Sequence, residues 1–351
     1  MIKSVQSLRF VFILLVVFSH IYGKVFDFGG ECGVSFFFML SGFILSYAYG
    51  QRVADGTFST RAFIAKQLTR LYPLHLLTFA VMVLLDARLG ILYEWYRLLP
   101  NALLLQSWIP DDSFFFVANG SSWFLSDLLF FYLVFALAFR VLVSLSPKQL
   151  AAMAATVLLA YVVIAFSIPL RKVNAVLYAS PLLRLIDFSI GILCCRLLAS
   201  DWGQRFTRRL QTLSTTAMTL VEVLLIAGAV ASFFVYEGMS LRLRCVALFW
   251  LYLPLLLVVY VGADKGRGVV TAIFHHPLMQ WLGGVSFELY LTHYVVLRLW
   301  WSFLLSLGYS YEVRTTLTVI ILTVILTIVV AWLTKRLFVE PVGWRLRTLI
   351  K

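Results

Sequence analysis

Residues 7–23 read SLRFVFILLVVFSHIYG, an apolar run long enough to cross a bilayer as one helix. Arg9 and His20 interrupt the run and stand eleven positions apart. At about 100° per residue both side chains lie on one helix face, ~16 Å apart along the axis. Ionisable groups inside a membrane are costly and are usually functional. The pair therefore predicts an anion site near one membrane face and a titratable group deeper in the bilayer. The alternative is an arginine that extends to the interface and a hydrogen-bonded core histidine.

The composition is that of a membrane protein. Of 351 residues, 62% are hydrophobic and only 13% are charged, too few to cover a soluble surface of this size. The apolar runs do not alternate with polar residues as the strands of a membrane β-barrel would. We expect about ten helical spans, at residues 7–23, 33–50, 71–89, 123–145, 150–169, 177–198, 217–236, 243–262, 282–306 and 313–334.

These spans leave no sizeable soluble segment, so residues 1–351 are expected to form a single all-α transmembrane bundle. The stretch 97–108 is too short and interrupted to cross, which predicts a re-entrant or interfacial segment. No small-residue cleavage site follows the first run, so we expect it to be retained. Most of the 29 basic residues fall inside if the N-terminus is cytoplasmic, which predicts that both termini are cytoplasmic.

Charge and cysteine content narrow the function further. The net charge of +13 is explained by basic cytoplasmic loops, so we expect no nucleic-acid partner. The four cysteines have no metal-ligand spacing, and we expect neither a metal nor a bound cofactor. They are Cys32, Cys194, Cys195 and Cys245.

Two polar positions lie close to the second and third spans. Lys66 and Arg70 are four residues apart and share a helical face ahead of Pro73. They are either a membrane anchor or a cytoplasmic phosphate site. Ser41 precedes Gly42, a pair that allows close helix approach and offers a hydroxyl.

Later segments add further candidates. Trp123 fits an interfacial aromatic belt. Arg184 and Asp187 stand three apart and favour a structural ion pair within the membrane.

A polar stripe lies in the ninth expected span. Ser286, Tyr290 and His293 share one helical face, while Glu288 lies on another. Glu288 either orients a histidine on a neighbouring helix or pairs with an arginine. The residues alone leave both readings open.

Taken in order, these segments resemble the acyltransferase-3 family of membrane O-acyltransferases. The resemblance runs from residue 7 to about 300 and rests on six motifs. They are Arg9-x10-His20, Gly33 to Phe43, Phe63 to Pro73, Trp123 to Tyr132, Arg184 to Gly191, and Leu282 to His293. Two positions depart from the family pattern: Gln67 replaces an arginine, and Leu128 replaces an acidic residue that Asp127 precedes.

The resemblance implies an acyl-CoA donor, expected to be cytoplasmic acetyl-CoA. Lys66, Arg70 and Ser41 would bind it, and Arg9, expected to be catalytic together with His20 and Glu288, would help to hold its phosphates. His20 would act as general base or carry the acyl group, with Glu288 fixing its tautomer. The supporting residues would be Trp123, Arg184, Asp187, Tyr290 and His293.

The resemblance also implies the setting of the reaction. The acceptor would be a sugar hydroxyl on a cell-surface polysaccharide or its lipid-linked precursor, at a bacterial inner membrane. Two alternatives remain. A transporter or flippase of lipid-linked saccharides would show internal repeats and broken midplane helices, which are not evident. A membrane scaffold would tolerate replacement of Arg9 and His20.

Overall fold

The computed structural model describes residues 2–22, 29–240, 249–310, 312–313 and 316–350. This part of the chain is helical and contains no strand, as the sequence predicts. The α-helices are α1 (Lys3–Tyr22), α2 (Gly30–Ala54), α3 (Thr60–Arg88), α4 (Trp95–Ala102), α5 (Asp112–Phe115), α6 (Trp123–Ser144), α7 (Pro147–Ser167), α8 (Pro181–Ala199), α9 (Asp201–Thr212), α10 (Thr215–Glu237), α12 (Phe249–Gly262), α13 (Val269–His275), α14 (Pro277–Gly284), α15 (Ser286–Ser306), α16 (Leu317–Thr334) and α17 (Glu340–Ile350). Short 3₁₀ helices are η1 (Gln106–Trp108), η2 (Gly120–Ser122) and η3 (Leu170–Lys172), and π-helical turns are η4 (Asn174–Tyr178) and η6 (Lys335–Val339). Cys245 and part of the expected span 243–262 lie outside the described residues.

Six helical stretches among the described residues are long and apolar enough to cross a membrane, which makes the chain a multi-pass membrane protein. They are Lys3–Ile21, Gly30–Ala54, Thr60–Arg88, Gly120–Phe139, Thr215–Val235 and Leu317–Leu346. Ten spans were expected. The other four expected spans fall on α7, α8, α12 and α15. Two of these helices contain charged residues, Arg184 and Asp187 in α8, and Glu288 and Arg298 in α15.

The stretch 97–108 forms no spanning helix. It is divided between α4, which contains Pro100, and the 3₁₀ turn η1. α4 has eight residues, far fewer than a bilayer requires. The prediction that this stretch does not cross is confirmed.

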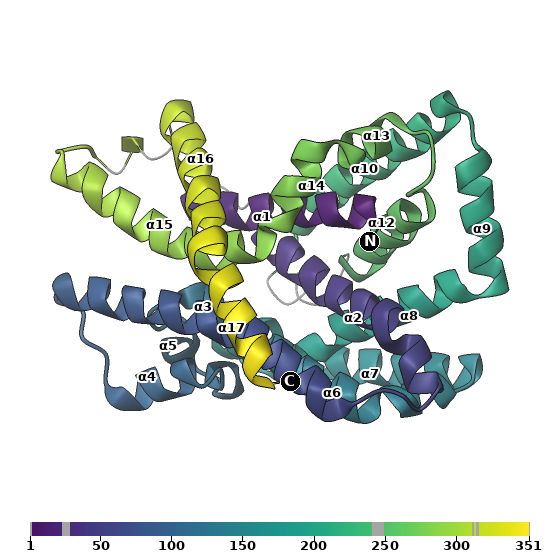
Figure 1. The fold of residues 1–351 in the computed structure, drawn as a ribbon, viewed down its shortest axis with the longest axis horizontal. Coiled ribbons are helices and arrows are strands. Elements are labelled where there is room, and N and C mark those ends of the chain that lie inside the picture. The colour runs from purple at the N-terminus through teal and green to yellow at the C-terminus, as the bar shows by residue number, and fades with distance from the viewer. Residues whose placement is uncertain (1, 23–28, 241–248, 311, 314–315, 351) are drawn as a thin grey trace.

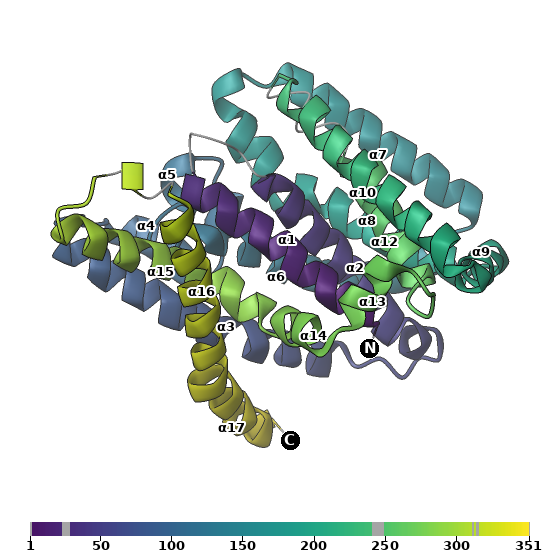
Figure 2. The same cartoon turned by 90° about the horizontal axis from the view of Figure 1, so that it is seen from above.

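Helices α1 and α2 lie in the middle of the bundle. Seen from above, α7, α8, α9, α10 and α12 lie on one side of them, and α3, α4, α15 and α16 on the other (Figure 2). α16 and α17 pass diagonally across the front (Figure 1). Most residues in the apolar window of each of these two helices are buried, so more than one face of each helix lines the interior.

Helices α2 and α8 cross closely at two glycines. A Cβ on Gly42 would lie 2.0 Å from the carbonyl oxygen of Phe188, and one on Gly191 would lie 1.8 Å from that of Met39. Real Cβ atoms do not approach backbone this closely, so only glycine allows the contact. The close approach that the Ser41-Gly42 pair predicted is confirmed.

We expect Gly42→Ala and Gly191→Ala each to destabilise the protein, because the added methyl must push two backbones apart. Overpacking of this kind costs about 1–3 kcal/mol or more. Thermal unfolding of the purified protein in detergent measures the loss. Gly50→Ala, on the same helix with no atom within 4 Å, is the matched control and should leave the melting temperature unchanged or raise it. Equal melting temperatures for all three variants would contradict the glycine crossing.

Candidate functional site

Three cavities contact α1 and are linked through shared lining residues. We call them the basic cavity (about 550 Å³), the central cavity (about 260 Å³) and the histidine cavity (about 380 Å³). Arg9 lines the first two, and His20 lines the third. The two ionisable residues of α1 therefore lie at opposite ends of this linked series.

The basic cavity gathers cations from distant parts of the chain. Four cations and one carboxylate line it: Arg9, Lys66, Arg70, Lys335 and Glu288. Within the described ranges, none of the four cations forms a salt bridge. A group of like charges inside a membrane protein favours an anionic ligand, because hydrocarbon supplies no counterion.

Helix α3 presents two cations to the basic cavity. Ser59 caps the N-terminus of α3, and Lys66 and Arg70 follow one turn apart on the cavity side. Lys66 donates from Nζ to the Tyr49 hydroxyl at 3.1 Å. Gln67 is only 4% exposed and does not line the cavity. Gln67 holds the position of the first arginine of the family motif. The residue before it, Lys66, supplies the cation to the cavity instead.

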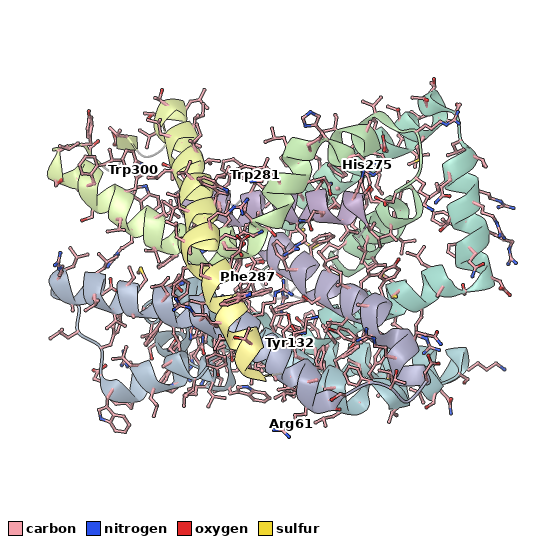
Figure 3. All side chains as sticks on the ribbon, viewed as in Figure 1. Arg61, Tyr132, His275, Trp281, Phe287 and Trp300 are labelled. Carbon is pink, nitrogen blue, oxygen red and sulfur yellow. The ribbon has the colours of Figure 1, made fainter. Side chains whose placement is uncertain are left out.

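The central cavity is smaller than the other two and mostly apolar. It is lined by Phe37, Phe124 and Leu128, by Arg9 and Arg70 at the basic end, and by Tyr290 at the other. Figure 3 shows two further lining residues, Phe287 and Tyr132, in the middle of the molecule, while Arg61 projects at its edge.

Ser41 belongs to the central cavity and does not line the basic one. Its hydroxyl donates to the carbonyl oxygen of Phe37 at 2.8 Å. Ser41 therefore shares a cavity with Arg70 but not with Lys66. The position suits contact with the uncharged part of an extended ligand.

His20 lines the histidine cavity in a defined tautomer. Its Nδ1 lies 2.8 Å from the carbonyl oxygen of Val16. A carbonyl oxygen only accepts, so Nδ1 carries the proton and Nε2 is the basic nitrogen of the neutral ring. The arrangement can perform general-base or nucleophilic chemistry at Nε2.

The polar stripe of α15 runs between the cavities. Ser286 lines the central cavity, and Tyr290 lines both the central and the histidine cavities. His293 is fully buried behind them, with its ring centre 5.0 Å from that of His20. The Tyr290 hydroxyl donates to the Ser121 carbonyl oxygen at 3.1 Å, which fixes this ring between the two cavities.

Glu288 and His20 line different cavities. Glu288 lies among the cations of the basic cavity, close enough to interact electrostatically with Lys335, Arg9 and Arg70. The contact between Glu288 and the His20 imidazole, one of the two readings of the sequence, is not present. Glu31 instead supplies a carboxylate to the histidine cavity. It stands in the first turn of α2, where a helix favours negative charge, and that position was the available signal.

The predicted ion pair of α8 supports the wall of the histidine cavity. Arg184 Nη1 lies 3.2 Å from Asp187 Oδ2, and Arg184 Nη2 donates to Ser35 at 3.0 Å. The guanidinium also lies 5.7 Å from the ring centre of Tyr178. Tyr178 lies against Trp123, with ring centres 4.8 Å apart, and both line the cavity.

A second charged cluster, which the sequence did not reveal, joins α3 to α15. Buried Asp86 accepts from Arg298 Nη2 at 2.9 Å and from the Tyr93 hydroxyl at 2.8 Å. Burial, followed by the bond to Asp86, raises the pKa of Tyr93 to about 12, so this phenol stays a donor at neutral pH. One turn before Arg298, Tyr294 lines the histidine cavity and packs edge-on against His20. The cluster thus holds the wall that contacts His20.

Comparison with known proteins identifies relatives. The family model described as "Acyltransferase domain", of the acyltransferase-3 family, matches residues 2–336. "Acyltransferase MdmB" of Streptomyces mycarofaciens is 28% identical over 287 residues, which cover 77% of this chain and 68% of that protein. "Protein 2 in picA locus" of Rhizobium radiobacter is 45% identical over 49 residues, 14% of this chain and 26% of that protein. No solved structure matches.

We expect Asp187→Asn to destabilise the protein by about 3–5 kcal/mol, because it leaves the Arg184 charge buried without its carboxylate. Thermal unfolding measures the effect. The control is Arg336→Gln, which breaks an exposed pair with Glu340 (3.3 Å) and should change stability by less than about 0.5 kcal/mol. The double variant Arg184→Met with Asp187→Leu should recover part of the loss. A stable Asp187→Asn protein would show that the pair does not support this wall.

Proposed function

Because the chain belongs to the acyltransferase-3 family, we propose that it is a membrane O-acyltransferase that moves an acetyl group from cytoplasmic acetyl-CoA to a sugar hydroxyl on the opposite side of the membrane. The acceptor is a cell-surface polysaccharide or its lipid-linked precursor, and the membrane is the bacterial inner membrane. The observation that carries the proposal is the series of three cavities linked by shared lining residues, with cations at one end and His20 at the other.

The basic cavity suits the donor. Coenzyme A carries a 3′-phosphate and a diphosphate, and Lys66, Arg70 and Arg9 offer charge-assisted hydrogen bonds to such groups. With the N-terminus cytoplasmic, this cavity faces the compartment that holds acetyl-CoA. The negative charge of Glu288 offsets part of the mutual repulsion among the cations.

The central cavity suits the uncharged arm of the donor. Arg9 and Arg70 line its entrance, while Phe37 and Phe124 line its interior with Ser41. Arg9 and His20 are ~16 Å apart along α1, so phosphate groups held at the first residue need an extended arm to bring the thioester near the second. Mostly apolar walls suit such an arm and exclude bulk water from the thioester.

The histidine cavity suits the acceptor and the transfer step. Nε2 of His20 takes the proton of the sugar hydroxyl as its oxygen attacks the thioester carbonyl. A C–O bond forms, the C–S bond breaks, and the proton passes to the departing thiolate to give free coenzyme A. The same nitrogen can instead carry the acetyl group between donor and acceptor. Trp123, Tyr178 and Tyr294 offer aromatic walls for a sugar ring.

We expect His20→Ala to lower acyl transfer by about 10²–10⁴-fold, the usual contribution of a general base. Arg9→Ala should also reduce transfer, because it removes the cation shared by the basic and central cavities. Isolated membranes supplied with acetyl-labelled acetyl-CoA measure label in the glycan fraction. His276→Ala, an exposed histidine at the start of α14, is the matched control and should retain activity.

Two results would contradict this assignment. Full acyl transfer by the His20→Ala variant would show that His20 is neither the general base nor the carrier of the acetyl group. Uptake of a labelled lipid-linked saccharide by the wild type, without acylation, would favour a transporter or flippase instead.

A second comparison separates the two carboxylates. Glu31→Gln should lower kcat with little change in the KM for acetyl-CoA, because Glu31 shares the cavity of His20. Glu288→Gln should mainly change that KM, because Glu288 lies among the cations of the donor cavity. Steady-state kinetics on both variants distinguish the roles. A loss of kcat in Glu288→Gln alone would instead assign Glu288 to the imidazole.

A further inference from the structure

The C-terminal helices form one wall of the basic cavity. α16 continues through the π-helical turn Lys335–Val339 into α17, and α17 packs against α3. Lys335, Val339 and Gly343 all line the cavity. They repeat every four residues and so form one stripe along the helices. The matched family region ends at residue 336, so this wall lies at and beyond its end.

Lys335 faces the cavity while its neighbour does not. The Nζ of Lys335 donates to the carbonyl oxygen of Gly284, which also lines the cavity. Arg336, the next residue, does not line it and pairs with Glu340 on the exposed side of the helix. The two adjacent cations therefore have different environments, one inside the cavity and one outside.

The excess of positive charge in the cavity favours a bound anion, and Lys335 has donors available for it. Four cations face the single carboxylate of Glu288, and none is in salt-bridge contact with it among the residues described. An ammonium group has three donors, and the bond to Gly284 uses one of them. Two donors remain for the oxygens of an anion bound in the cavity.

We propose that Lys335 binds a phosphate group of the acyl-CoA donor and so makes the C-terminal segment part of the donor site. The inference rests on the proposed function and extends it to a residue outside the six motifs. An anionic lipid headgroup offers the same phosphate chemistry, so the test must separate the two sources.

The experiment measures binding of coenzyme A, without acceptor, to the full-length protein in nanodiscs of zwitterionic lipid. Stabilisation against thermal unfolding gives the dissociation constant. Lys335→Gln should raise it about tenfold or more, the value of one hydrogen bond to a charged group. Lys335→Arg should recover most of the affinity, and Arg336→Gln should bind like the wild type because its charge lies outside the cavity.

Each other outcome has a distinct meaning. Wild-type affinity in Lys335→Gln would overturn the inference and leave the proposed function standing. A lower melting temperature without ligand, at unchanged affinity, would show that Lys335 acts only through Gly284. If anionic lipid stabilised the wild type but not Lys335→Gln, with equal coenzyme A affinities, the ligand would be a lipid and the inference wrong. No binding of coenzyme A by the wild type would overturn the proposed donor itself.

Discussion

A charge inside a bilayer needs a partner within the protein, because hydrocarbon offers none. The bundle meets this constraint in two ways. Where a carboxylate is at hand, the charges pair, as in Arg184 with Asp187 and Arg298 with Asp86. Where cations outnumber carboxylates, the helices leave an open space instead, the basic cavity. The paired charges hold the walls, and the unpaired ones define where an anion is expected to bind.

Helix α2 connects the charge pair of α8 to the histidine cavity. Its later half is fixed to α8 by the glycine crossing at Gly42, and its Ser35 accepts a hydrogen bond from Arg184. Its first turn carries Glu31 to the cavity of His20. Packing, ion pairing and the position of a candidate carboxylate therefore depend on the placement of one central helix between α1 and α8.

The sequence predicts those features of the fold and site that depend on local periodicity. The shared face of Arg9 and His20, the Arg184–Asp187 pair and the close approach at Gly42 all follow from spacings along one helix. The Asp86–Arg298 pair joins residues 212 positions apart, so no spacing reveals it. For Glu288 the spacing predicted the helical face. It did not predict which residues of other helices that face meets. The expected ten spans exceed the six clear ones partly because charges that the bundle buries interrupt the apolar sequence of α8 and α15.

The ring of Tyr290 lies between the central and histidine cavities and is held by its bond to Ser121. A multi-pass protein with one continuous aqueous bore would let protons flow down their gradient and would dissipate the energy stored across the membrane. The Tyr290 side chain stands where the central and histidine cavities meet, because it lines both of them. In the proposed reaction the acetyl group would have to pass this ring to travel from the donor cavities to His20.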